Sequence, residues 1–282
     1  MLRAAETRVL FLGDSITQDG RWVTQVEGAM RATDPYRDVE IVNMGLGSET
    51  VSGLSEPNHA DGKFPRPDLH ERLARVLTGY KPTLVIACYG MNDGIYLPLD
   101  PQRQEAFQSG AAHLKEEVEK IGGRIIFLSA PLFMPDTPEK DVKGYDKVLG
   151  AYAGWLVSKE KDGWKVVDIR PELKRSVQQA KKNDPSFIYA KDGVHPGADG
   201  HRFIAEAACK GLWPLLGLEG DPVLPTGEAL KILSQRQDLL KYAWLSETKH
   251  LRPGIKAGLP LDEAQKQAGE LLAKYHQANG GR

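Results

Sequence analysis

Two short segments of the sequence hold the residue types that are needed to transfer an acyl group. Ser15 stands in GDSIT, directly after the apolar run of residues 8–12, and Asp192 precedes His195 by three residues in DGVHP. That spacing lets the aspartate hold one imidazole nitrogen, so that the other nitrogen can take a proton from a serine hydroxyl. The sequence therefore predicts Ser15, Asp192 and His195 as nucleophile, orienting acid and general base.

Two further segments offer hydrogen-bond donors for a developing oxyanion. Residues 43–50, NMGLGSET, form a turn of small residues whose backbone N–H groups can approach an anionic atom closely. Asn92, in GMNDG, adds a side-chain amide that donates a hydrogen bond without titrating. Such donors stabilise the tetrahedral transition state of acyl transfer, so the four segments together supply a complete set of catalytic groups.

Each segment also has a structural explanation when it is taken alone. Ser and Asp are favoured helix caps, Asn-Asp-Gly is typical of a turn, and a lone loop histidine is usually solvated. NMGLGSET is not a dinucleotide fingerprint, because its third glycine is missing and it follows the second predicted strand. The combination of all four segments favours chemistry over structure.

The elements that must position these segments follow from hydrophobic patterning. Continuous apolar runs such as VLFL, TLVIAC and RIIFLS are typical of parallel strands buried on both faces, and segments of helical periodicity separate them. We expect an α/β/α sandwich of three layers, in which the candidate segments follow the carboxyl ends of strands, where ligands bind. Five strands are predicted, at residues 8–12, 39–42, 83–88, 124–129 and 165–168.

The chain divides into two predicted parts. Residues 1–215 form the main domain, and residues 216–282 form a helical extension packed on it, with helices at 227–247 and 261–277. Near the end of the first helix, residues 244–254 include His250 and Arg252. This stretch could cap the crevice, contact a partner or cover the core, and the sequence leaves these three roles open.

In chain order, GDSIT, NMGLGSET, GMND and DGVH make residues 9–213 resemble the SGNH hydrolases, a GDSL-like family. The resemblance implies a flavodoxin-like fold and ester hydrolysis through an acyl-enzyme, without a metal or organic cofactor. It also implies an oxyanion hole formed by the N–H groups of Ser15 and Ser48 and by the Asn92 amide. The family usually has glycine at the position of Ser48, but a serine supplies the same backbone N–H.

The substrate is predicted less sharply than the reaction. The absence of a long apolar lid and the 7% of aromatic residues argue against a lipase. The resemblance to a family in which many members remove acetyl groups from polysaccharides implies a short-acyl (acetyl) esterase of carbohydrates, acting on small-molecule or polysaccharide esters. The alternatives are a lipase, lysophospholipase or thioesterase of the same fold, and a noncatalytic carbohydrate-binding or scaffold protein. Loop structure or core packing competes with substrate contact at each candidate lining residue. These residues are Gly47, His59, Arg66, Tyr96 and Phe133.

Composition excludes several partners. The 37 basic and 38 acidic residues give a net charge of −1, so nucleic acid is not an expected partner. No run approaches the roughly 20 apolar residues of a membrane span. Cys88 and Cys209 lie in apolar stretches and are expected to be buried free thiols. His201 follows His195 by six residues without any further metal-ligand spacing, so no metal is expected.

Two properties stay open at this point. The oligomeric state has no signal in the sequence. The N-terminal segment lacks the apolar region of a secretory signal. We expect a cytoplasmic protein if Met1 is the native start, and a periplasmic or secreted one if a signal peptide preceded it.

Overall fold

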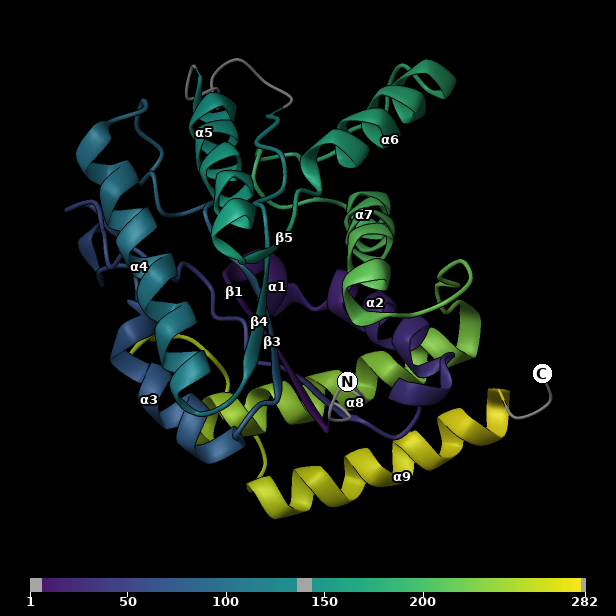
Figure 1. Cartoon of the computed structure of the whole chain (residues 1–282). Coiled ribbons are helices and arrows are strands. Elements are labelled where there is room, and N and C mark those ends of the chain that lie inside the picture. Colours follow the sequence, from purple (N-terminus) through teal and green to yellow (C-terminus); the bar gives the residue numbers. More distant parts are fainter. Residues whose placement is uncertain (1–6, 136–143, 280–282) are drawn as a thin grey trace.

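The sheet predicted from the apolar runs is present. The computed structural model of the chain describes residues 7–135 and 144–279, and its centre is a sheet of parallel strands (Figure 1). The strands lie in the order β2-β1-β3-β4-β5. Each predicted strand limit is within one residue of the observed one. The bounds are Arg8–Gly13 (β1), Glu40–Asn43 (β2), Leu84–Cys88 (β3), Arg124–Leu128 (β4) and Lys165–Val167 (β5).

Helices cover both faces of the sheet, which confirms the three-layer prediction. In Figure 1, α3, α4 and α5 lie on one side of the strands, and α2 and α7 lie on the other side, with α6 beside α7. The bounds are Ser15–Asp19 (α1), Arg21–Arg31 (α2), Leu69–Tyr80 (α3), Pro101–Lys120 (α4), Tyr145–Ser158 (α5), Arg170–Asn183 (α6) and Ala198–Leu216 (α7). Short 3₁₀ turns are Asp34–Tyr36 (η1), His59–Gly62 (η2) and Lys159–Asp162 (η4).

Local side-chain chemistry sets the starts of two of these helices. The Asp68 carboxylate accepts the His70 N–H, and the Asp100 carboxylate accepts the Arg103 N–H, each at 2.9 Å. Both are N-cap interactions that satisfy a donor left free at a helix start. Apolar residues three and four apart then place one face of α3 in the core. These residues are Leu69, Leu73, Val76, Leu77 and Tyr80.

The order of the strands brings the candidate segments to one edge. β1 lies between β2 and β3, and Gly13 at its end pairs with Cys88 at the end of β3. The chain turns from β1 toward β2 but reaches β3 on the other side, which is the switch point of a flavodoxin-like sheet. Residues that follow β1 and β3 therefore emerge beside each other.

The C-terminal helices cover the open edge of the sheet. α8 (Gly227–Glu247) packs against β2 and α2, and α9 (Leu261–Asn279) packs against α8, as the lower part of Figure 1 shows. Arg236 donates to the Ile41 carbonyl at 3.1 Å, and the Gln237 side chain accepts the Asn43 N–H at 3.2 Å. An edge strand has unpaired backbone groups, so these bonds give β2 the partners that another strand would supply.

Other sequence expectations can be compared with the same coordinates. Cys88 and Cys209 are buried free thiols, as predicted. Across residues 7–135 and 144–279, the helices lack the combination of length and apolarity that a membrane span needs. Within those ranges no three His, Cys, Asp or Glu side chains converge in a way that could hold a metal ion.

Candidate active site

The turn from β1 to α1 presents Ser15 at the start of a helix. A side chain on Gly13 would lie 2.6 Å from the Cys88 carbonyl oxygen, so the chain can make this turn only with glycine there. Asp14 caps α1 by accepting the Ile16 N–H at 2.9 Å. Ser15 is the first residue of α1, and the N–H of such a residue has no acceptor within its own helix.

Ser15, His195 and Asp192 form one chain of hydrogen bonds. Ser15 Oγ lies 2.8 Å from His195 Nε2, and His195 Nδ1 lies 2.6 Å from Asp192 Oδ2. The other carboxylate oxygen, Asp192 Oδ1, accepts the N–H groups of Val194 at 2.9 Å and His195 at 2.8 Å. With the proton on Nδ1, the imidazole keeps Nε2 free to accept the serine proton.

Asp192 stays ionised although it is partly buried. Burial raises the pKa of the carboxyl group, whereas the hydrogen bonds from the His195 ring and from two backbone N–H groups lower it. Together the hydrogen bonds outweigh burial, so the net pKa lies below its ordinary value. The side chains of His195 and Asp192 are 53% and 46% exposed. The three residues therefore form a hydrogen-bonded chain that solvent can reach, in the arrangement that a nucleophile and its base require.

The loop that bears His195 is held from two sides. The Gly193 carbonyl accepts the Met134 N–H at 2.9 Å, and Arg21 donates to the Pro196 carbonyl at 3.3 Å. Nearby, His201 is 1% exposed and lies 3.4 Å from Asp19, and burial lowers the pKa of His201 to about 4. His201 is therefore neutral at physiological pH and belongs to the packing between α1 and α7.

The turn of residues 43–50 packs directly on α1. Asn43 accepts the Gly45 N–H at 2.8 Å and donates to the Thr17 carbonyl at 2.6 Å. The Gln18 side chain accepts the Gly47 N–H at 2.7 Å. A side chain on Gly45 would lie 2.6 Å from the Gln18 nitrogen, so glycine permits this contact. The turn and the nucleophile are thus positioned as one unit.

Ser48 adopts a backbone conformation that favours glycine. Its φ is +64°, in the left-handed region, where a side chain is strained. Glycine adopts this conformation without strain, which gives a physical reason for the glycine that the resemblance implies at this position. Within the described residues, the Ser48 N–H has no hydrogen-bond acceptor, so it remains available to an oxyanion.

Asn92 is fixed at both ends of its amide. The side chain is buried, its Nδ2 donates to the Glu49 carbonyl at 3.1 Å, and its Oδ1 accepts the Tyr96 hydroxyl at 3.1 Å. Tyr96 in turn stacks on Tyr145, with ring centroids 4.9 Å apart. The amide group has a second N–H to offer, and the orientation of the amide is set by Tyr96 rather than by substrate.

Carboxylates behind the site were missed by sequence reasoning. Glu49 pairs with Arg72 through two bonds of 2.6 and 2.8 Å and accepts the Tyr89 hydroxyl at 2.6 Å, entirely within the core. Asp93 accepts the N–H groups of Val51 and Ser52 at 2.9 and 2.8 Å. The partners lie 23 to 42 residues apart, so no local spacing indicates either set.

Burial raises the pKa of three carboxyl groups at this edge of the sheet. Burial raises the pKa of Asp14 to about 7 and that of Asp93 to about 6. The pKa of Glu49 is also raised, by burial, although the Arg72 charge opposes the rise. Close to neutral pH, a change in pH therefore alters the charge of the carboxyl groups that accept the N–H groups of Ile16, Val51 and Ser52.

The remaining predicted lining residues differ in what they contact. Phe133 is 6% exposed and packs edge-on against Tyr145 at 5.3 Å, so it contributes mainly to the core. Arg66 is also buried, lies 5.3 Å from the centroid of the Tyr96 ring, and pairs with Glu56. His59 lies 3.3 Å from Glu56, and Gly47 lies in the turn beside Ser48.

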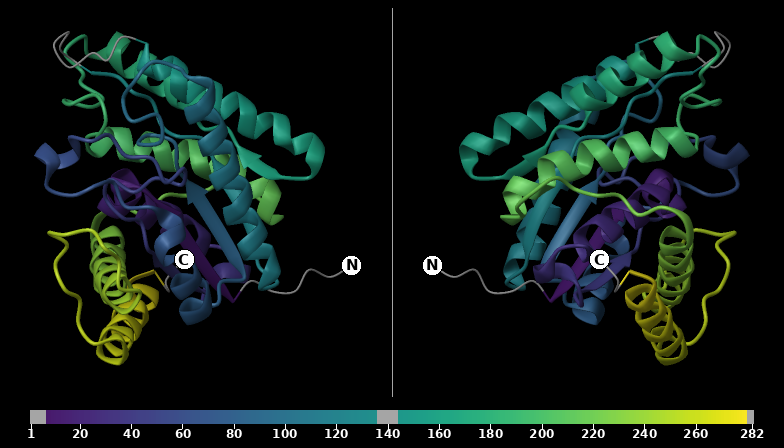
Figure 2. Two further views of the ribbon diagram at one scale, coloured as in Figure 1. Left: turned by 90° about the vertical axis from the view of Figure 1, so that its left-hand side faces the viewer. Right: turned by 90° about the vertical axis from the view of Figure 1, so that its right-hand side faces the viewer.

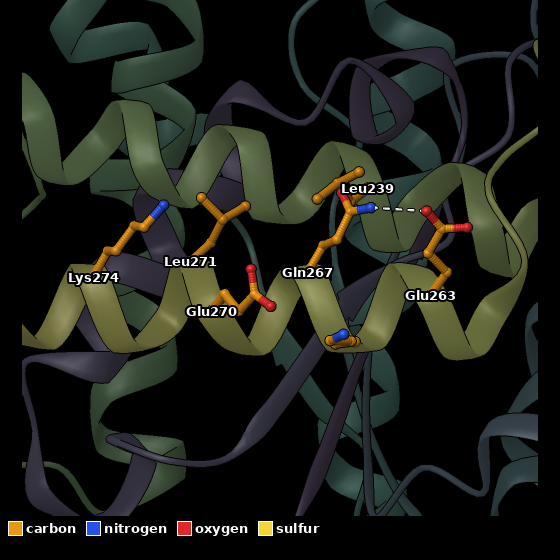
Figure 3. A pocket seen from close by; sticks show the side chains of 7 residues that line it. Leu239, Glu263, Gln267, Glu270, Leu271 and Lys274 are labelled. Atoms are coloured by element: carbon orange, nitrogen blue, oxygen red, sulfur yellow. Dashed lines mark hydrogen bonds between the residues drawn. The ribbon is translucent and has the colours of Figure 1, made fainter.

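A hollow in the surface lies away from these residues. Figure 3 shows this hollow, of about 460 Å³, between α8 and α9. Its lining residues are Leu239, Glu263, Lys266, Gln267, Glu270, Leu271 and Lys274, none of which is a candidate site residue. Ser15 is half-buried and His195 is exposed, so solvent reaches this pair from the surface.

Comparisons with known proteins identify a family model and several solved structures that match this chain. The model of the GDSL-like lipase/acylhydrolase family matches residues 11–203. No curated protein sequence matches the chain.

Several solved structures share the fold. Axe2, an acetylxylan esterase from Geobacillus stearothermophilus, is 21% identical, with a TM-score of 0.51 over 75% of this chain and 96% of that one. LAE5, an α/β hydrolase enzyme from the metagenome of Lake Arreo, is 24% identical, with a TM-score of 0.54 over 74% and 95%.

BT4096, a gut microbial diltiazem-metabolizing enzyme, is 20% identical, with a TM-score of 0.54 over 73% of this chain. The match spans 46% of the length of BT4096, so that enzyme contains a large part without a counterpart here.

Proposed function

The chain belongs to the GDSL-like lipase/acylhydrolase family and is a serine ester hydrolase, and from this premise we propose that it removes acetyl groups from carbohydrate esters with Ser15 as nucleophile. The observation that carries the assignment of residues is the hydrogen-bonded chain from Ser15 Oγ through His195 to Asp192, with distances of 2.8 and 2.6 Å. A serine hydroxyl is a weak nucleophile unless a base stands within hydrogen-bond reach.

In the first half of the reaction, Ser15 Oγ attacks the ester carbonyl carbon and its proton passes to His195 Nε2. The carbonyl oxygen becomes an oxyanion, which accepts the N–H groups of Ser15 and Ser48 and the free N–H of the Asn92 amide. When the tetrahedral intermediate collapses, His195 gives the proton to the leaving alcohol and an acyl-serine remains.

The second half repeats these steps with water. His195 takes a proton from a water molecule, the hydroxide attacks the acyl-serine, and the acid leaves as Ser15 regains its proton. Asp192, held ionised by its hydrogen bonds, stabilises the imidazolium in both halves. No step needs a metal or an organic cofactor.

Two observations support acetylated carbohydrate as the substrate class. The side chains of His195 and Asp192 are about half exposed, which suits an alcohol group too large for an enclosed pocket. Axe2, with the same fold, is an acetylxylan esterase. A lipase would need an apolar surface for a long acyl chain, whereas polar loops containing His59 and Arg66 adjoin this site.

The proposed division of the chain follows from its packing. Residues 1–215 would hold the whole hydrolase site, and residues 216–282 would form the extension. Lys241 of α8, which is buried, donates to the Gln18 carbonyl at the end of α1 at 2.7 Å. The extension thereby braces the helix that begins with the nucleophile.

The proposal is tested with p-nitrophenyl acetate, butyrate and octanoate at neutral pH, and with acetylated xylan, using the wild type and Ser15→Ala. We expect turnover of the acetate in preference to the octanoate, release of acetate from the polymer, and a loss of at least about 10⁴-fold in kcat for Ser15→Ala. A preference for octanoate would contradict the substrate class. Turnover that survives Ser15→Ala would contradict the mechanism.

A further inference from the structure

We use the term catalytic edge for Ser15, Asp192, His195, the turn of residues 43–50 and residues 92–93. The connection between α8 and α9 brings an arginine from the extension to this edge. A side chain on Gly47 would lie 3.2 Å from Arg252 Nε and 3.4 Å from its Cζ, so the guanidinium lies directly against Gly47. Arg252 Cζ is also 5.3 Å from the centroid of the Phe64 ring. In both views of Figure 2 this connection projects from α8 and α9 on the same side of the molecule as η2. Arg252 thus adjoins the residue that precedes Ser48.

Among the residues that the structure describes, none neutralises the charge of Arg252. In residues 7–135 and 144–279, its guanidinium forms no ion pair, and its only side-chain hydrogen bond goes from Nη1 to the Pro253 carbonyl at 2.9 Å. Arg252 Nε is buried without an acceptor. The acid of the adjoining loop, Glu56, is already engaged, because Arg66 donates to it twice at 2.6 Å and His59 lies 3.3 Å from it.

The surroundings of Arg252 are consistent with an excess of positive charge. Burial lowers the pKa of His59, the charge of Arg66 lowers it further, and Arg252 adds to the same effect although Glu56 opposes it. Burial also lowers the pKa of Arg252 itself. A partly buried guanidinium without a counter-ion is costly, and an anion brought by a ligand would offset that cost.

We propose that Arg252 binds a carboxylate on the alcohol portion of the ester, so that the substrates are acetyl esters of acidic carbohydrates such as uronate-containing glycans. The inference rests on the proposed esterase function and narrows it. An arginine matches a carboxylate in shape and in donor geometry, and Nη2 carries no other bond within the described residues. The extension would then contribute a specificity-determining residue as well as structural support.

The test uses two esters that differ mainly in charge, 4-acetoxybenzoate and 4-acetoxybenzamide. In each, Ser15 takes the acetyl group, the phenol leaves with a proton from His195, and water then releases acetate. We expect Arg252→Gln to lower the ratio of kcat/KM for the anionic ester over the neutral one about tenfold, through KM. Arg252→Lys should retain part of the preference, and Arg175→Gln, an exposed arginine on α6, should not alter it.

A ratio that stays the same in Arg252→Gln would overturn the inference, and so would an equal loss on both esters. Binding of 4-acetoxybenzoate to Ser15→Ala, measured by calorimetry with and without Arg252→Gln, separates this inference from the esterase proposal. If no ester is turned over but binding depends on Arg252, the esterase proposal fails and the anion site stands. If binding is the same with either residue, the anion site fails whatever the esterase result.

Discussion

The catalytic edge and the junction between α2 and α8 differ in how far their charged side chains are exposed to solvent. At the edge, the ion-paired side chains of His195 and Asp192 are 53% and 46% exposed. At the junction, which consists of Glu27, Arg31, Arg236 and Gln237, the side chains of Glu27 and Arg236 are 0% and 5% exposed. Both regions contain a carboxylate with basic partners, yet only the first can exchange its partners with a substrate.

The junction is a closed network. Glu27 accepts Arg31 Nε and Arg236 Nη1, each at 2.7 Å, and it also accepts the Gln237 amide. Gln237 connects onward to Asn43, whose side chain holds the Thr17 carbonyl of α1. The difference between the regions indicates a division of roles: the buried set holds α1 in position, and the exposed set is the one we propose to react. The largest loss of stability should therefore come from the region without catalytic groups.

We expect Glu27→Gln to lower the free energy of unfolding by about 3–5 kcal/mol, because it leaves two buried guanidinium groups without a counter-charge. Chemical denaturation of the purified variant measures this. Activity per folded molecule should fall far less than in Ser15→Ala, which in turn should unfold close to the wild type.

The matched control for Glu27→Gln is Glu228→Gln on α8. The Glu228 side chain is 67% exposed and lies 3.6 Å from Lys231, and an exposed pair of this kind contributes at most about 1 kcal/mol. Equal losses in the two variants would show that the burial of the network is not what matters, and the comparison of the two regions would fail.

Asp93 sharpens the comparison because it is a fully buried carboxyl group at the catalytic edge. Burial raises its pKa to about 6, above the ordinary value of 3.8, so ionisation opposes folding. The stability linked to this group is fully present below about pH 4 and is lost as the pH rises through 6, on the order of 3 kcal/mol.

Asp93→Asn should remove this dependence. The difference in Tm between Asp93→Asn and the wild type should shift in favour of the variant by several degrees between pH 4 and pH 8. Burial, the largest cause of the raised pKa of Asp14, is the same in both proteins and cancels when the two curves are subtracted, whereas the smaller rise caused by the Asp93 charge is lost in the variant. Parallel Tm curves would contradict the assignment.

Much of the sheet, and the contact between Ser15, His195 and Asp192, was predictable because the signals are local. The strands are buried on both faces and therefore read as continuous apolar runs, so their predicted limits are within one residue. Asp192 and His195 are three residues apart, and Ser15 directly follows a strand, so their chemistry is visible in short segments. The helix of residues 227–247 was also predicted to its limits.

Contacts between distant segments were not predictable in this way. Glu27 meets Arg236 and Gln237 across 209 and 210 residues, and no periodicity connects them. The same holds for Arg252 beside Gly47, although the sequence left open that its segment caps the crevice. Tyr96 was predicted to line the pocket, but its hydroxyl orients Asn92, a role that only the geometry of the turn reveals.

Ser48 gives the smallest expected effect and the sharpest test of strain at the catalytic edge. Its φ of +64° costs a non-glycine residue on the order of 1 kcal/mol or more, which Ser48→Gly would relieve. Part of the gain is offset because glycine is more flexible in the unfolded chain, so we expect a net rise of up to about 1 kcal/mol in unfolding free energy. Ser48→Ala, which keeps the strain and removes only the hydroxyl, should show no such rise. If the alanine variant gains as much as the glycine variant, the hydroxyl and not the backbone is the source of the instability. Both variants retain the N–H proposed for the oxyanion hole, so a difference in kcat between them would measure how far the strained conformation aims that donor.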